Sequence, residues 1–285
     1  MAVTTVTTEE RTSSRWMLRV LLQLVGIAAF LVLVPLAFRM EWKRFLPLFD
    51  WITIRFFFFG LVATVVVSLI SIIASLPLAT ALALGRLSTI RWLRWPSTAF
   101  IEVVRALPLI LLIFYINLRF PGLDFFEGLG LSSSTDYTVI ELNRLLSRFA
   151  LAMIIALTLY TAAVNAELLR SGILSLERGQ FEASRALGLS YWQMMRLVIL
   201  PQAFRRTIAP LIAQFTILVK DTSLGSIIGF VELQRRAVIH YQQHFNPMEA
   251  LFVVALIYFA INYLLGLASK LVERRRPSVQ APLEL

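Results

Sequence analysis

A few charged and hydroxyl side chains interrupt long apolar runs of this sequence, where polar groups are costly and need a reason. Arg105 lies about one-third of the way along the run at 96–118, three residues before Pro108. Such groups can guide a polar solute through a membrane, or they can form structural ion pairs and snorkel to a membrane surface. Both interpretations stay open. The candidate residues for a solute path are Arg105, Glu167, Lys220, Asp221, Thr222 and Ser223.

The residues at 220–223 separate two apolar stretches, which predicts a helix broken at membrane depth. A broken helix is tolerated there only where its backbone lines protein or a wet cavity. Thr222 or Ser223 could cap the next helix, whose N-terminus would then favour a solute carboxylate. Lys220 and Asp221 could pair with the two ends of a zwitterion. A plain cap and ion pair at a helix junction is the structural alternative.

The composition places these residues in a membrane protein. Hydrophobic residues make up 58% of the 285 residues and charged residues 15%, against about 45–50% and about 25% in soluble domains. The net charge of +10 comes from Lys and Arg between apolar runs and in the termini. It indicates topology signals and contacts with anionic lipid rather than nucleic acid. The chain contains no cysteine, which excludes disulfides and thiolate chemistry.

The apolar runs predict an all-α bundle of about six transmembrane helices. Residues 1–16 form a polar tail that we expect to be disordered and cytoplasmic, and 273–285 form a cytoplasmic C-terminal tail. The first span is too long for a signal-peptide core and lacks a clean cleavage site, so we expect it to stay uncleaved as an extra N-terminal helix. The predicted spans are 17–38, 56–84, 96–118, 149–169, 206–219 with a start as early as 201, and 251–272.

A less apolar stretch at 179–201 has the periodicity of two short amphipathic helices. Gly188 stands where a helix often ends in the left-handed conformation, and Ser190 with Gln193 has the spacing of a capping box. Pro201 suits the first turn of a further helix. With the N-terminus inside, basic residues favour the same side of the membrane as this stretch, so we expect it to face the cytoplasm.

At this stretch the sequence resembles a known family. The spacing of Glu182, Ala183, Gly188, Val198, Leu200 and Pro201 is similar to the EAA loop of ABC importer permeases. AELLRSGI before the loop, GQ ahead of Glu182, and KDTSL with Glu232 and Leu233 after it resemble the polar amino acid subgroup. The resemblance covers roughly 56–272. Ser184 replaces the second Ala of the motif, and Val198 stands where Ile is usual.

The resemblance implies a type I ABC importer permease bundle, with its core at 56–272, in a bacterial inner membrane with both termini cytoplasmic. The implied partners are ATPase subunits, a second permease subunit that is identical or paralogous, and an extracytoplasmic amino-acid-binding protein. ATP and magnesium would be bound by the ATPase, and no cofactor by this chain. The expected coupling helix presents Gln180, Phe181, Glu182, Ala183, Ser184, Leu187, Gly188 and Tyr191 to the ATPase.

No catalytic cluster and no Walker A pattern occurs in the sequence, so we expect no hydrolysis of ATP by this chain. His240 and His244 are one helical turn apart, but no third ligand is near and Gln242 and Gln243 indicate a solvated loop. We therefore expect no metal. The sequence predicts a permease subunit for polar amino acids. The alternatives are a permease for another small polar solute, and a channel or secondary transporter that works without ATP.

Overall fold

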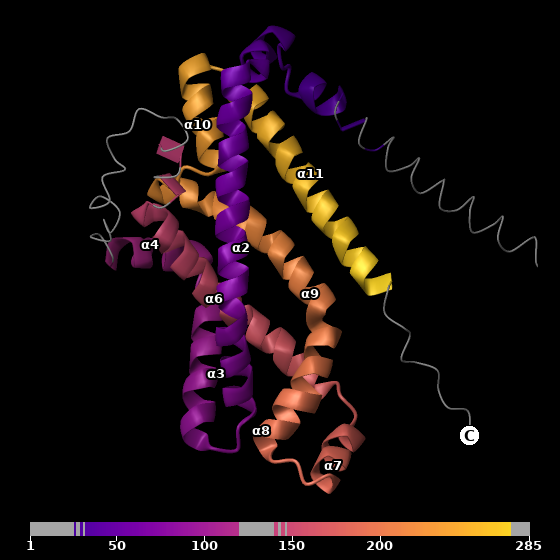
Figure 1. The fold of residues 1–285 in the computed structure, drawn as a ribbon. Coiled ribbons are helices and arrows are strands. Elements are labelled where there is room, and N and C mark those ends of the chain that lie inside the picture. The colour runs from indigo at the N-terminus through magenta and orange to yellow at the C-terminus, as the bar shows by residue number, and fades with distance from the viewer. Residues whose placement is uncertain are drawn as a thin grey trace, which may run out of the picture.

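The computed structural model describes residues 32–119 and 147–274, together with residues 26, 29, 30, 140, 141, 144 and 145. Within these residues every regular element is a helix (Figure 1). The predicted all-α membrane fold is confirmed. The polar tail at 1–16, most of the first predicted span at 17–38 and the tail beyond residue 274 lie outside the described residues.

Apart from the stretch between Arg119 and Arg148, most of which lies outside the described residues, the helices follow one another with short connections. In chain order they are the 3-10 helix η1 (Trp42–Phe49), α2 (Trp51–Leu87), α3 (Arg91–Ala106), α4 (Leu109–Arg119), α6 (Arg148–Leu174), α7 (Arg178–Ala186), α8 (Tyr191–Met194), the π-helical segment η4 (Met195–Ile199), α9 (Leu200–Asp221), the 3-10 helix η5 (Thr222–Ile228), α10 (Leu233–His244) and α11 (Pro247–Arg274).

Helices α2 and α6 form the centre of the bundle and share its most extensive contact. The buried face of α2 is made of small and hydroxyl side chains, including Ser68, Ser71 and Ala79. The buried face of α6 is rich in alanine, and small residues let two backbones approach closely. Asn165 of α6 donates from Nδ2 to Oγ of Ser75 at 3.1 Å. These two helices therefore provide a tightly packed frame for the others.

Four stretches of the described chain are long and apolar enough to cross a membrane, and the bent pair α3 and α4 makes a fifth. The four are Trp51–Leu87, Arg148–Leu174, Tyr191–Ile228 and Pro247–Leu271. The fifth predicted span begins at the early limit of its range, with Pro201 in the first turn of α9.

The predicted span at 96–118 is formed by the bent pair α3 and α4 rather than by one continuous helix. The chain bends by 105° between α3 and α4. Leu107 adopts an extended conformation with ψ of 135°, as the residue before a proline prefers. Pro108 also lacks the N–H that would continue the helix. Arg105 consequently lies in the last turn of α3 rather than inside a straight membrane helix.

The predicted helix break at 220–223 is wrong. Helix α9 runs through Asp221 and tightens into η5, and the chain leaves the helical conformation at Gly229, whose φ is 96°. Thr222 does not cap a new helix, because its Oγ1 donates to the carbonyl of Val219 at 2.8 Å. The chain turns where a left-handed residue is available, eight residues after Asp221.

Figure 1 shows α7 and α8 at one end of the bundle, where the turn between α2 and α3 also lies. Helix α10 lies at the opposite end, beside the first part of α2. The loop that carries α7 and α8 is therefore separated from α10 by the length of the bundle.

Candidate coupling surface and polar centres

Helix α7 ends as the sequence predicts. Gly188 has a φ of 71°, and its N–H donates to the carbonyl of Arg185 at 2.9 Å. The N–H of Leu189 reaches back to the carbonyl of Ser184 at 3.2 Å. These bonds satisfy carbonyls at the end of α7 that have no partner within the helix. The chain consequently reverses within a few residues.

The predicted capping box opens α8. The N–H of Gln193 donates to Oγ of Ser190 at 3.4 Å, and the N–H of Ser190 donates to Oε1 of Gln193 at 2.9 Å. The next five residues are π-helical, which was not predicted from the sequence. They join α8 to α9 without a break in the helical path, so the loop and the long span form one continuous rod from Tyr191 to Ile228.

The eight predicted coupling residues divide into an exposed group and a supporting group. Leu187 is 79% exposed and Tyr191 is 47% exposed, although both are apolar or aromatic. The supporting residues face inward: Oγ of Ser184 donates to the carbonyl of Gln180 at 2.6 Å, and Phe181 packs in an apolar cluster. The exposed group is Glu182, Ala183, Leu187, Gly188 and Tyr191, which we call the coupling surface.

The coupling surface is held firmly against the bundle. Phe181 packs with a buried cluster contributed by α6, α8, η4 and α9. Nε2 of Gln202 in α9 donates to Oε1 of Gln180 in α7 at 3.0 Å. Gly172 lets α6 and α9 approach closely, since a Cβ there would lie 2.5 Å from a methyl group of Thr207. Packing and a hydrogen bond therefore join α7 to α9.

The six predicted path residues do not form one cluster. Among the described residues, no hydrogen bond or ion pair joins Arg105, Glu167 and the segment at 220–223 to one another. Glu167 instead accepts from Arg86 at 2.7 Å and pairs with Arg170 at 3.1 Å, and Arg86 also pairs with Glu102. These four charges tie α2, α3 and α6 together.

The segment at 220–223 presents its side chains in different directions. Lys220 is exposed, Asp221 and Ser223 are half-buried, and Thr222 is fully buried. No ion pair forms between Lys220 and another residue of the described chain. Arg105 is exposed and likewise has no ion-pair partner there. Lys220 and Arg105 are thus exposed cations without an ion-pair partner among the described residues.

A second polar centre, which sequence reasoning missed, lies where α10 meets α2. Arg236 is only 1% exposed and forms an ion pair with Glu141. Its Nη1 donates to the carbonyl of Phe56 at 2.8 Å, and its guanidinium lies 4.5 Å from the centre of the Phe56 ring. Gly60 makes room for the arginine, since a Cβ there would lie 2.5 Å from Cδ of Arg236.

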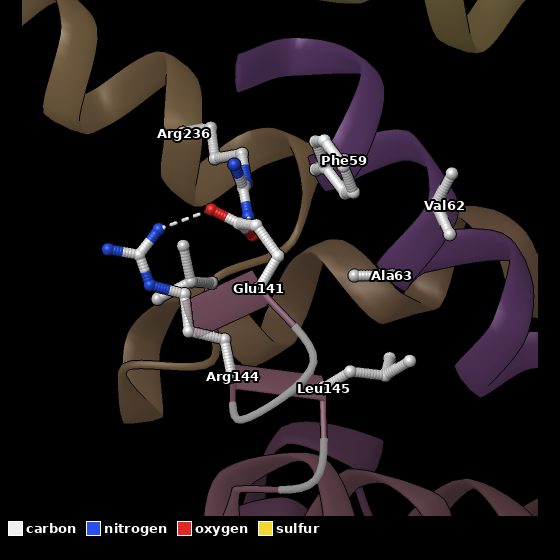
Figure 2. A pocket seen from close by; sticks show the side chains of 8 residues that line it. Phe59, Val62, Ala63, Glu141, Arg144, Leu145 and Arg236 are labelled. Atoms are coloured by element: carbon white, nitrogen blue, oxygen red, sulfur yellow. Dashed lines mark hydrogen bonds and ion pairs between the residues drawn. The ribbon is translucent and has the colours of Figure 1, made fainter. Parts of the chain in front are cut away.

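Figure 2 shows the cavity beside this centre, with a volume of about 220 Å³. Arg144 also donates to Glu141 at 2.7 Å, so two guanidinium groups share one carboxylate. The other lining side chains are apolar. The lining residues are Phe59, Val62, Ala63, Glu141, Arg144, Leu145, Val231 and Arg236.

The predicted solvated loop around His240 and His244 is wrong. Both residues belong to α10, and Glu232 caps this helix by accepting from the N–H groups of Gln234 and Arg235 at 2.7 Å each. His240 is buried and stacks on His244 at 4.3 Å. Burial lowers the pKa of His240 to about 4, and the neighbouring His244 contributes in the same direction. The spacing of Leu233, Ala237 and His240 was the signal for this helix.

Comparison with known proteins supplies the context for both regions. Residues 75–277 match the family described as binding-protein-dependent transport system inner membrane component. The glutamate transport system permease protein GluD of Corynebacterium glutamicum is 36% identical over 82% of this chain and 79% of its own length. The glutamate/aspartate import permease protein GltK of Escherichia coli O157:H7 is 31% identical over 80% of this chain and 98% of its own length.

A solved structure of a transporter is similar to this chain in fold. The chain is similar to one reported as the crystal structure of an amino acid ABC transporter with histidines, with a TM-score of 0.63 and 26% identity. The likeness covers 80% of this chain and 99% of that chain. The family match includes α7, α8 and α9, where the sequence motifs are densest.

Proposed function

Because the chain belongs to the family of binding-protein-dependent transport system inner membrane components, we propose a residue-level account of how it carries out transport. It is a multi-pass inner-membrane permease of an ATP-driven importer for polar amino acids. The family membership implies an ATPase and a solute-binding protein as partners. Three parts of the chain take separate roles in transport: the coupling surface, the rod from Tyr191 to Ile228, and the exposed cations.

The coupling surface docks into a cleft of the ATPase. The observation that carries this assignment is the exposure of Leu187 and Tyr191 on a helical pair that is otherwise firmly packed. Exposed apolar side chains on a rigid support are typical anchors of a protein interface. Glu182 adds an acidic group that suits basic or polar groups of the partner. Gln180, Phe181 and Ser184 keep the docking helix in place.

Movement of the ATPase then reaches the membrane through α8, η4 and α9. When ATP draws two ATPase subunits together, the docked helices move as rigid bodies and the spans switch between inward-open and outward-open states. ATP and magnesium bind to the ATPase, and this chain contributes no cofactor site. A second permease subunit, identical or paralogous, completes the path, and the binding protein delivers solute on the outer side.

The segment at 220–223 lies toward the far end of the same rod, and we assign it to the solute path. Lys220 and Asp221 offer one charge of each sign to a zwitterion, and Thr222 holds the turn by its bond to Val219. Arg105 supplies a further cation at the bend between α3 and α4. Glu167 acts on the path indirectly, by fixing α2, α3 and α6 through Arg86 and Arg170.

Glutamate and aspartate are the first solutes to test, because two similar relatives are named for them. The exposed cations Lys220 and Arg105 suit a solute with two carboxylates. The measurement is the ATPase activity of the copurified complex, reconstituted with its binding protein, in the presence of each of the twenty amino acids. Stimulation by none of them, with an intact complex, would contradict this assignment.

The docking assignment is tested by reversing one charge and introducing another on the coupling surface. Glu182→Lys and Leu187→Glu should abolish uptake and weaken copurification of the ATPase, while the protein still inserts into the membrane. Neither side chain makes a hydrogen bond or ion pair with the described residues, so the fold should persist. Glu177→Lys is the matched control, since Glu177 is exposed and makes no side-chain cap bond to α7.

Intact uptake and intact ATPase copurification in both coupling-surface variants would overturn the proposal. They would favour a channel or secondary transporter in which α7 is only an amphipathic surface helix. That alternative also predicts transport by the purified chain alone in vesicles without ATP.

A further inference from the structure

The charges of α2 mark the two faces of the membrane. Residues 56–85 contain no charged side chain, and Arg55 and Arg86 stand at either end. At about 1.5 Å per residue this stretch is about 45 Å long, which matches a bilayer of about 40–45 Å with its headgroup regions included. With the coupling surface in the cytoplasm, Arg55 therefore lies close to the outer headgroup level and Arg86 close to the inner one.

Four of the five exposed tryptophans of the described chain lie close to the same two levels. Trp42 and Trp51 are exposed next to the outer end of α2, and Trp92 and Trp95 are exposed just beyond its inner end. Tryptophan prefers the membrane–water interface, where its ring meets both apolar and polar surroundings. This arrangement has the form of an aromatic belt at both membrane faces.

The inner end carries a distinct surface at the start of α3. It consists of Ile90, Arg91, Trp92, Leu93, Arg94 and Trp95, which we call the Trp–Arg surface. Ser97 lies level with Gly85, since a Cβ on Gly85 would overlap Oγ of Ser97. The Trp–Arg surface lies directly beyond this contact. It is therefore at the inner headgroup level, near Arg86.

The Trp–Arg surface is strongly apolar and positively charged. Trp92 is 90% exposed and Trp95 is 77% exposed. Arg91 and Arg94 form no ion pair with the described residues. The nearest acidic residue along the chain after Asp50 is Glu102, and that carboxylate is paired with Arg86. The surface thus offers cations and aromatic rings without any counter-charge from the described chain.

We propose that the Trp–Arg surface binds the headgroups of anionic phospholipids in the inner leaflet. Arg91 and Arg94 contact phosphate oxygens, for which guanidinium groups have suitable bidentate geometry. Trp92, Leu93 and Trp95 lie at the same level, among the headgroups. Consecutive residues 91–96 are all exposed, so the turn of helix is open on every side. A lipid layer can surround such a turn, whereas a docked protein would cover one face.

The test uses the full chain in nanodiscs of phosphatidylcholine with a minor fraction of phosphatidylglycerol. Trp16, Trp42, Trp51 and Trp192 are replaced by Phe, so that only Trp92 and Trp95 fluoresce. One of the two lipids carries bromine, which quenches nearby tryptophan. At equal mole fraction, brominated phosphatidylglycerol should quench more strongly than brominated phosphatidylcholine. Each Arg→Gln change should lower this lipid preference about fivefold, as expected for about 1 kcal/mol per basic residue.

Two controls make the outcome decisive. Arg91→Lys with Arg94→Lys should keep much of the preference, because the charge is retained. A background with only Trp42 and Trp51 should show a weaker preference at the outer end. Equal quenching by both lipids at Trp92 and Trp95 would overturn the proposal. So would an absence of quenching combined with shielding of both rings only after the ATPase is added, which would show a protein contact instead.

Discussion

The buried side chain of Arg236 makes four different contacts. It forms an ion pair with Glu141, a hydrogen bond to the carbonyl of Phe56 and a cation–π contact with the Phe56 ring, and it packs closely against Gly60. A buried charge of this kind is costly unless its partner is present. The sequence shows only a pair of arginines in a polar stretch, and nothing in their spacing indicates which one is buried. Arg235, the neighbour, is only half-buried.

Glu141→Gln should lower the free energy of unfolding by about 3–5 kcal/mol, because it leaves Arg236 buried without its carboxylate. The combined change Glu141→Leu with Arg236→Met should cost much less than the single change. The measurement is a denaturant titration of the detergent-purified chain. The exposed pair Arg44–Glu41 is the matched control, and Glu41→Gln should change stability by less than about 1 kcal/mol. Equal costs in both pairs would contradict the role given to Arg236.

Gly60→Ala should lower the free energy of unfolding by about 1–3 kcal/mol, since the new methyl group would overpack the junction of α2 and α10. It would lie 2.5 Å from Cδ of Arg236 and 3.0 Å from the backbone of Leu233. Gly266→Ala is the control in α11, where no atom lies within 4 Å of the added carbon. That change should be neutral or slightly stabilising, by up to about 1 kcal/mol. Thermal unfolding of both variants checks the difference.

At the scale of elements, the loop between α6 and α9 is where sequence reasoning succeeded. Gly188 and the pair Ser190 and Gln193 specify a local turn. Turns of this kind depend on residues close together in the sequence, so the sequence alone predicts them. The prediction of a helix break at 220–223 was wrong because polar residues were taken as a sign of a helix end. The hydroxyl of Thr222 instead bonds to the preceding turn, and the chain turns later at Gly229.

Tertiary relations were not predictable in the same way. Glu167 has one partner nearby in the sequence, Arg170, but its other partner, Arg86, is 81 residues earlier in the chain. The burial of His240 depends on Phe57 of α2, whose ring centre is 5.6 Å away. Pairings of this range arise from packing between helices, which a single sequence does not display.

Gly188→Ala should reduce uptake, because a residue with a side chain pays about 1–2 kcal/mol to adopt the left-handed conformation. The cost falls on the turn that presents Leu187 and Tyr191. Gly179→Ala is the matched control, since both glycines have open space around them and only Gly188 has a positive φ. Hydrogen exchange of the amides at 187–194 measures the loosening of the turn. Unchanged exchange in Gly188→Ala would show that the turn tolerates the substitution.

At the scale of the whole molecule, the coupling surface and the polar centre around Arg236 lie at opposite ends of the bundle (Figure 1). The proposed topology places α7 in the cytoplasm and α10 on the outer side. Positive charge at the turn between α2 and α3 agrees with this orientation. The Trp–Arg surface and the coupling surface then face the same compartment.

Because the chain has no cysteine, single introduced cysteines can report this topology directly. Gln242→Cys in α10 should react with a membrane-impermeant maleimide in cells whose outer envelope is permeabilised and whose inner membrane is intact. Leu187→Cys in α7 should react only in inverted vesicles. Both positions are exposed, so accessibility is limited by the membrane alone. The reverse labelling pattern would invert the topology and remove the coupling surface from reach of a cytoplasmic ATPase.

The π-helical segment at Met195–Ile199 sets the phase between the coupling surface and the span beyond it. A wider turn contains an additional residue relative to an α-helical path. Since one α-helical residue corresponds to about 100° of rotation, losing that residue would turn α8 by roughly a quarter of a circle about the axis of α9. Tyr191 would then point in a new direction, although no residue of α8 had been substituted. The segment thus fixes the direction in which α8 presents Tyr191 relative to the span formed by α9.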